Sequence, residues 1–192
     1  MTMTSSICSA AASDAGLSAD RLGALVTVAR QAADAGGAEL MRHYGRLSSI
    51  ESKGRIGDLV TNADVAAERV VLELLGRETP DIAVLAEESG AAGEQDGLRW
   101  CVDPLDGTTN FTHGYPFFAT SIGLTFRQRP ILGAIAVPFL GETYWGAPGH
   151  GAHCNDSKIQ VSPCERLEDS LLVTGFAYDR HTRLDNNYAQ FC

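Results

Sequence analysis

In the stretch WCVDPLDGTTNFTHGYPFF, residues 100–118, two aspartates stand three residues apart and are followed at once by Gly-Thr-Thr-Asn. The apolar run before Asp103 is typical of a strand. Pro104 fixes its own φ and keeps the residue before it extended. We therefore predict a sharp turn after this strand, in which Asp103, Asp106 and the Leu105 carbonyl face one point.

Acidic side chains also close a second apolar run, AVLAEES, at Glu87 and Glu88. Loops at strand ends are common places for functional sites. Carboxylates gathered at one point repel one another, so such a group must be protonated, pair with a base or hold a cation. The donors are hard oxygens without adjacent His or Cys, which suits Mg²⁺ or Mn²⁺ better than Zn²⁺. The alternative is that DPLDG is an Asp-rich surface turn, because Asp, Pro and Gly all favour turns.

The residues after the second aspartate favour the site over the simple turn. Gly107 lets the backbone approach a ligand closely, and Thr108, Thr109 and Asn110 resemble the opening of a helix whose first amides point at an anion. This pattern predicts a phosphate-binding loop beside a metal site. A helix N-terminus contributes only about 0.3–2 kcal/mol to holding a charge. Metal ions would therefore supply most of any phosphate chemistry.

The rest of the chain divides into helical and extended segments. Apolar residues recur at helical spacing from Ser18, a potential N-cap, to about Tyr44, where we expect the Gly36–Gly37 pair to bend the helix. A second helix is predicted from near Asn62 to Leu75, with Asp64 in its first turn. Short apolar runs then indicate strands near 82–88, 98–103, 117–126, 131–139 and 143–147. Helices layered on a largely antiparallel or mixed sheet, an α/β (α+β) fold, are expected.

Composition narrows the classes of function. The chain has 192 residues, 44% of them hydrophobic, and a formal charge of -9, so it fits a globular domain without a basic face for nucleic acid or an anionic membrane. No apolar run reaches the roughly 20 residues that a membrane helix needs. Five cysteines without a C-x-x-C pair suggest free thiols in the cytoplasm. Residues 1–17 lack the features of a secretory signal and are expected to form a disordered tail.

Three separated motifs carry a resemblance to a known family. The segments GDLVTNAD, AEES and DPLDGTTNFTHGYPFFATSIG occur in the order found in inositol monophosphatases. The resemblance runs from about Ser18 to the end of the chain, and TTNF after the DG distinguishes it from histidinol phosphatases and fructose bisphosphatases. It implies a lithium-sensitive, Mg²⁺-dependent phosphatase with a layered α-β-α-β-α fold over residues 18–192. Family members are often homodimers.

The resemblance also implies roles for individual residues. Glu87, Asp103 and the Leu105 carbonyl would bind one metal ion, and Asp103 and Asp106 would reach toward a second. Gly107 and Thr108 would hold phosphate through their amides. Asp64 and Thr108 would together orient and activate the attacking water. Three further positions rank below these. They match family positions that lie near an additional, weaker metal ion or behind the metal ligands: Glu88, Asp58 and Lys53.

Two departures from the family pattern are visible. Ala86 stands where the family commonly has Gly, a change we expect to be tolerated. The family also continues past NNYAQFC with a W-D motif, whose aspartate completes the second metal site, and a glutamate that contacts inositol. We therefore expect a C-terminally incomplete domain. The leading hypothesis is hydrolysis of myo-inositol monophosphates; the alternatives are a histidinol phosphate or fructose bisphosphate phosphatase, or an inactive fragment.

Overall fold

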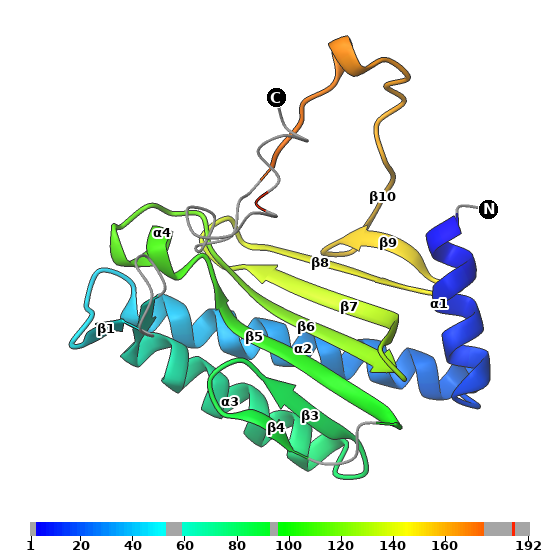
Figure 1. Cartoon of the computed structure of the whole chain (residues 1–192), viewed down its shortest axis with the longest axis horizontal. Helices are drawn as coiled ribbons and strands as arrows, with labels where there is room; N and C mark the ends of the chain where they lie inside the picture. The colour runs from blue at the N-terminus through cyan, green and yellow to red at the C-terminus, as the bar shows by residue number, and fades with distance from the viewer. Residues whose placement is uncertain (1–2, 53–58, 93–95, 175–185, 187–192) are drawn as a thin grey trace.

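An eight-stranded mixed sheet forms the centre of the protein, with long helices packed along it (Figure 1). The computed structural model describes residues 3–52, 59–92, 96–174 and 186. The strand order is β10-β9-β8-β7-β6-β5-β3-β4, in which β3 and β5 run parallel and the other neighbours antiparallel. The predicted mixed sheet with layered helices is confirmed.

Five of the eight sheet strands follow the predicted apolar runs, whereas the strands over 90–92, 151–154 and 157–159 were not predicted. The eight strands are β3 (Ala83–Ala86), β4 (Gly90–Ala92), β5 (Leu98–Asp106), β6 (Ala119–Phe126), β7 (Arg129–Val137), β8 (Glu142–Ala147), β9 (Gly151–Cys154) and β10 (Ser157–Ile159). A separate two-stranded sheet joins β1 (Ile50–Ser52) to β2 (Leu59–Thr61), and a short 3-10 helix, η1, spans Leu167–Asp169.

Two long helices, α2 (Ala19–His43) and α3 (Asn62–Glu78), start where the sequence predicted. The Ser18 hydroxyl accepts a hydrogen bond from the Arg21 amide at 3.2 Å and caps α2. α2 continues through Gly36 and Gly37, and the close packing of these glycines explains their presence. A Cβ at Gly36 would lie 2.7 Å from Cγ2 of Thr120, so only glycine lets α2 approach β6 here. None of the described helices is long and apolar enough to cross a membrane.

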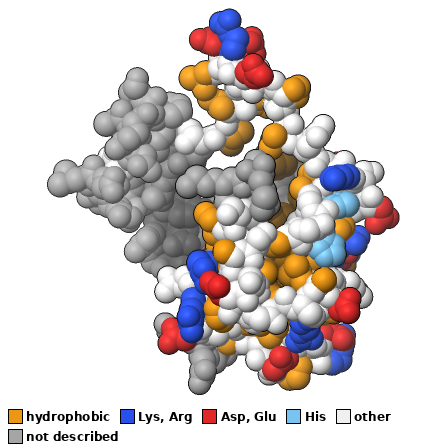
Figure 2. All heavy atoms as spheres, turned by 90° about the vertical axis from the view of Figure 1, so that its right-hand side faces the viewer, with side chains coloured by type: hydrophobic (Ala, Val, Ile, Leu, Met, Phe, Trp, Pro, Cys, Tyr) orange, Lys and Arg blue, Asp and Glu red, His pale blue; other side chains and the backbone are white. Residues whose placement is uncertain are grey.

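The N-terminal segment differs from the prediction. Helix α1 spans Met3–Asp14 and packs on β7, whereas we expected a disordered tail over residues 1–17. Its contact side chains are small: Ala11 and Ala12 are buried in the main core. This helix lies at one end of the sheet, where apolar side chains gather beside a pocket lined by Cys8, Ile131 and Pro148, among others (Figure 2).

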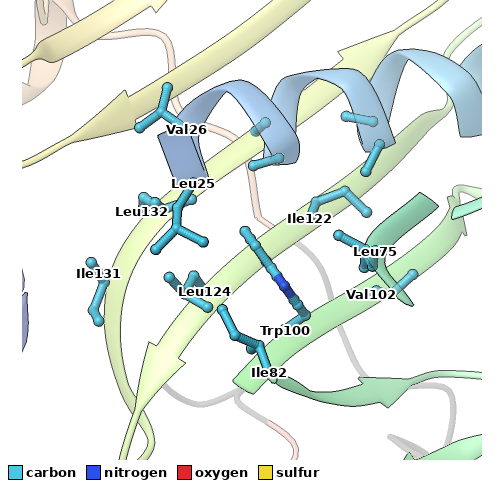
Figure 3. Close-up of a cluster of buried hydrophobic side chains, with 14 of the residues drawn as sticks. Leu25, Val26, Leu75, Ile82, Trp100, Val102, Ile122, Leu124, Ile131 and Leu132 are labelled. Atoms are coloured by element: carbon cyan, nitrogen blue, oxygen red, sulfur yellow. The ribbon is translucent and has the colours of Figure 1, made fainter. Parts of the chain in front are cut away.

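The main core lies between the sheet and the helices, around the fully buried Trp100 (Figure 3). The Trp100 indole Nε1 donates to Thr79 Oγ1 at 2.9 Å, and that hydroxyl donates to the Leu75 carbonyl at 2.8 Å. The only polar atom of this large side chain is thus satisfied in the core.

A second, smaller cluster packs under the end of β5 that carries the aspartates. Its buried members are Leu40, Ala63, Ala67, Leu105, Phe111 and Phe118, with Tyr44 packed against them. The rings of Phe111 and Phe118 meet edge to face at 4.7 Å between centroids. This cluster supports the segments that carry the candidate site.

Candidate active site

The two aspartates of the DPLD segment lie on strand β5 at a β-bulge. Asp103 pairs with Ser121 and Asp106 with Ala119, so two residues of β5, Pro104 and Leu105, oppose only Thr120 of β6. The predicted sharp turn is therefore wrong: the strand continues through Asp106. In a regular strand, residues three apart point to opposite faces. The bulge buries both Pro104 and Leu105 and returns Asp106 to the face of Asp103.

Pro104 is tolerated inside the sheet because of this bulge, where the ladder is interrupted. Its carbonyl accepts a hydrogen bond from the buried Thr120 hydroxyl at 2.9 Å. The Asp103 carboxylate in turn accepts from the Leu105 amide at 3.1 Å. These contacts fix the backbone between the two aspartates, as the proline in the sequence suggested.

Asp64 lies at the start of α3, where it has two separate sets of partners. Its Oδ2 accepts from the Thr61 amide at 2.8 Å and from the Thr61 hydroxyl at 2.7 Å, which completes a capping box. Its Oδ1 faces the Thr108 hydroxyl at 3.2 Å. Asp64 is 1% exposed. Burial raises its pKa, although the hydrogen bonds from Thr61 and Thr108 oppose this shift.

Thr108 begins α4 (Thr108–Thr112), directly after the bulge, as the sequence predicted. Its hydroxyl also lies 3.0 Å from the Leu105 carbonyl, so it connects α3 with the bulge of β5. Gly107 caps α4 with φ 90°, in the left-handed region that favours glycine. A Cβ there would lie 3.1 Å from the Phe117 carbonyl, so a side chain would crowd the returning loop.

Glu87 follows β3, the parallel neighbour of β5, and therefore ends near Asp103. The pKa of Asp103 is raised to about 7 by burial first, then by the charge of Glu87 and a hydrogen bond with it, and then by the charge of Asp106. The Leu105 amide acts in the opposite direction. Three carboxylates predicted to share a site from separate segments thus interact in the structure.

A comparison with protein families bears on this site. The model of the inositol monophosphatase family matches residues 22–192. The chain belongs to this family. It is 50% identical over 166 residues to an inositol-1-monophosphatase of Synechocystis, covering 86% of this chain and 58% of the relative. It is 41% identical to a fructose-1,6-bisphosphatase/inositol-1-monophosphatase of Aquifex aeolicus, covering 78% and 57%.

Solved structures agree with the sequence relatives. The inositol monophosphatase structure from Anabaena superposes with a TM-score of 0.77 at 45% identity, covering 89% of this chain and 62% of that one. The α/β fold of the family is therefore confirmed. The chain spans about three-fifths of the length of these relatives.

The donor atoms fit the metal dependence that is general for the inositol monophosphatase family. Among the residues that the structure describes, no three His, Cys, Asp or Glu side chains are already grouped to hold a metal ion. Mg²⁺ does not require such a group, because it usually keeps several waters and uses one or two carboxylates plus substrate phosphate. Burial first, and then the charges of Glu87 and Asp106, raise the pKa of Asp103, and a cation beside this carboxylate would offset both effects.

The lower-ranked predictions have different outcomes. Lys53 and Asp58 lie outside the described residues. Glu88 is half-buried next to Glu87, and its amide donates to a side chain that the sequence analysis missed: Glu68 Oε2, at 2.9 Å. Glu68 is 5% exposed and follows Asp64 by one helical turn. That i, i+4 spacing of two acids on one helix was a signal that could have identified it.

Proposed function

We propose that the site hydrolyses monoesters of phosphate with small polyols, myo-inositol monophosphates first among them, with the help of Mg²⁺. The observation that carries the proposal is the bulge of β5, which sets Asp103 and Asp106 on one face and leads directly into Gly107 and Thr108. The names of the Synechocystis and Anabaena relatives support this choice of substrate.

In this proposal Glu87, Asp103, the Leu105 carbonyl and Asp106 would hold the cations, with Mn²⁺ as a substitute. When bound, the cations supply positive charge to the phosphate oxygens and to the leaving oxygen. The amides of Gly107 and Thr108 would hold the phosphate group. All these groups come from the end of β3 and from the β5–α4 segment, so their relative positions depend on the pairing of β3 with β5.

Asp64 and Thr108 would orient the attacking water. When the Thr108 hydroxyl donates to Asp64 Oδ1, its oxygen retains lone pairs that can accept a proton from water. Burial raises the pKa of Asp64, which strengthens the carboxylate as a base. Because Thr61 holds Oδ2, the basic Oδ1 stays directed at Thr108.

The proposal is tested by measuring phosphate released from inositol 1-phosphate across a Mg²⁺ titration. We expect activity that requires Mg²⁺ at millimolar concentration, is inhibited by Li⁺ and is lost with Asp103→Asn or Glu87→Gln. The exposed Asp96→Asn serves as the matched control and should behave as the wild type. Activity that persists in excess chelator would refute the metal-dependent mechanism.

Fructose 1,6-bisphosphate is a second candidate substrate, because the Aquifex relative carries both names. The same assay with fructose 1,6-bisphosphate, and with histidinol phosphate as a third arm, compares the kcat/KM values directly. A higher kcat/KM for either compound than for inositol 1-phosphate would overturn the substrate we place first.

A cytoplasmic location and a homodimer belong to the same proposal. The first is supported by the four cysteines of the described residues, Cys8, Cys101, Cys154 and Cys164, which are free thiols. The second is supported by the resemblance to the family. Fractionation of cells and light scattering of the purified chain would test them.

A further inference from the structure

We propose that Glu68 is a positioning residue for the cation site, because its carboxylate fixes the strand end that carries Glu87. This inference rests on the proposed function, and it concerns a residue on α3, outside both the Gly107–Thr108 segment and the bulge. It follows from the hydrogen bonds of one helix face and of three successive backbone amides.

The face of α3 that points at the site carries two buried acids, Asp64 and Glu68. Residues four apart lie one above the other on a helix, so the two carboxylates are neighbours on the same face. Asp64 contacts Thr108, on the α4 side of the site, while Glu68 contacts the segment after β3. One helix therefore holds both of the segments between which the cation would lie.

The amides after β3 show how closely Glu68 determines this segment. The Glu87 amide donates to the Val102 carbonyl at 3.1 Å and extends the pairing with β5 by one residue. The next two amides turn away from the sheet: Glu88 donates to Glu68 Oε2 at 2.9 Å and Ser89 to Oε1 at 3.0 Å. Glu87 is thus held by a sheet hydrogen bond on one side and by Glu68 on the other.

Glu68 places one more buried acid near the carboxylates of the candidate cation site. The reason for an acid at this position lies in its hydrogen bonds. A buried charge is costly unless it is well hydrogen-bonded, and here both oxygens accept backbone N–H groups. A glutamine of the same shape has one acceptor oxygen and would turn an NH₂ group toward the second N–H donor. Only the carboxylate satisfies both amides, which fixes the backbone at Glu87 and so the direction of its side chain.

Two measurements on the full chain test the inference with the variant Glu68→Gln. Hydrogen exchange, followed by NMR in the metal-free protein, reports whether the amides of Glu88 and Ser89 lose protection. A Mn²⁺ titration followed by EPR reports cation affinity without any turnover. Loss of a residue that orients a metal ligand typically costs about 10–100-fold in metal affinity. We expect a loss of Mn²⁺ affinity in this range, together with faster exchange at these two amides.

The matched control is Thr79→Val, at the other end of α3. It leaves the Trp100 indole without its acceptor and should lower the melting temperature while Mn²⁺ affinity stays at the wild-type value. If Glu68→Gln does not fold, Glu68→Asp keeps the charge, withdraws it by one methylene and should show the same two changes.

The outcomes separate the inference from the proposed function. Wild-type Mn²⁺ affinity in a folded Glu68 variant overturns the positioning role alone. Unchanged exchange at Glu88 and Ser89 also overturns it, as does an equal loss of affinity in Thr79→Val. A wild-type chain that binds no Mn²⁺ overturns the proposed function and this inference together.

Discussion

At the scale of single residues, Asp64 serves the fold with one oxygen and faces the candidate site with the other. Oδ2 completes the capping box with Thr61, and Oδ1 meets the Thr108 hydroxyl. Replacing a capping side chain by alanine typically costs about 0.5–2 kcal/mol of stability. Variants of Asp64 therefore combine two effects, and Thr108 is the better residue for isolating the chemistry.

The first prediction concerns the Thr108 hydroxyl. Thr108→Val keeps the shape of the side chain but removes the group that would orient water, so kcat should fall by about 10²–10⁴-fold, the usual contribution of acid–base catalysis. Thr108→Ser keeps the hydroxyl and should recover most of the rate. Steady-state kinetics on inositol 1-phosphate and a Mn²⁺ titration provide the measurements. If Mn²⁺ affinity falls and kcat does not, Thr108 belongs to the cation site instead.

The second prediction concerns pH and the metal-free protein. The pKa of Asp103 is raised from 3.8 to about 7, so the folded state binds this proton more tightly than the unfolded state. Stability from this group is present at low pH and is lost as pH rises from about 4 to about 7. Asp103→Asn should therefore gain in melting temperature relative to the wild type across that window and stay level above it.

Thermal unfolding in chelator between pH 4 and 8 measures this difference, with the exposed Asp96→Asn as the control that should follow the wild type. Parallel curves for the wild type and Asp103→Asn would show that neither burial nor the charges of Glu87 and Asp106 raise the pKa of Asp103.

At the scale of elements, two helical glycines predict opposite effects of the same substitution. Gly36 of α2 faces β6 and α3, where a Cβ would lie 2.7 Å from Thr120 and 3.0 Å from Val71. Gly76 of α3 has no atom within 4 Å of that position. Gly36→Ala should lose about 1–3 kcal/mol through overpacking. Gly76→Ala should gain about 0.5–1 kcal/mol, because alanine is the better helix former.

Urea unfolding of both variants gives the two free energies. A neutral Gly36→Ala would mean that α2 can move away from β6 without cost. Since Thr120 also holds the Pro104 carbonyl, activity should fall in Gly36→Ala and remain unchanged in Gly76→Ala.

The elements also show where prediction from sequence succeeded. Helices α2 and α3 carry caps and apolar periodicity, and β3, β5, β6, β7 and β8 carry short apolar runs, so these local patterns sufficed to predict them. Helix α1 was missed because its contacts use small residues such as Ala11 and Ala12, which give no strong apolar period. The bulge was missed because it depends on the register of β5 against β6, a contact that the local turn propensity of DPLDG does not encode.

The residues of the candidate site also divide into those that a sequence motif predicts and those that only the three-dimensional contacts reveal. The pattern of acids after apolar runs predicted Glu87, Asp103 and Asp106, and the family resemblance implied roles for Asp64 and Thr108. Glu68 was not predicted, because its partners are backbone amides of a distant segment, and a sequence does not show which amides lack a partner.

At the scale of the whole molecule, the core of the described residues is divided into two clusters, and the smaller one contains Leu105 of the bulge and Phe111 of α4. Ile122, in the main cluster, and Phe111, in the smaller one, are both buried. Ile122→Val should cost about 0.5–1.5 kcal/mol and leave kcat unchanged. Phe111→Leu should cost about 1–3 kcal/mol and also reduce kcat, because Phe111 lies within α4 and packs on Tyr44 and Phe118.

Melting temperatures and steady-state rates of both variants, measured well below the unfolding transition, test this separation. Equal effects on kcat would indicate that the two clusters respond as one unit and that the smaller cluster has no particular relation to the site.

The bulge has a consequence for how the gene can change in length. Two aspartates separated by a single residue in a regular strand also share a face, so losing the codon for Pro104 would straighten β5 and still present both acids together. What such a shortened chain would lack is the Pro104 carbonyl, which accepts the hydrogen bond from the Thr120 hydroxyl of β6. Comparing Mn²⁺ binding of the Pro104 deletion with that of the parent chain isolates the value of this one peptide unit for the cation site.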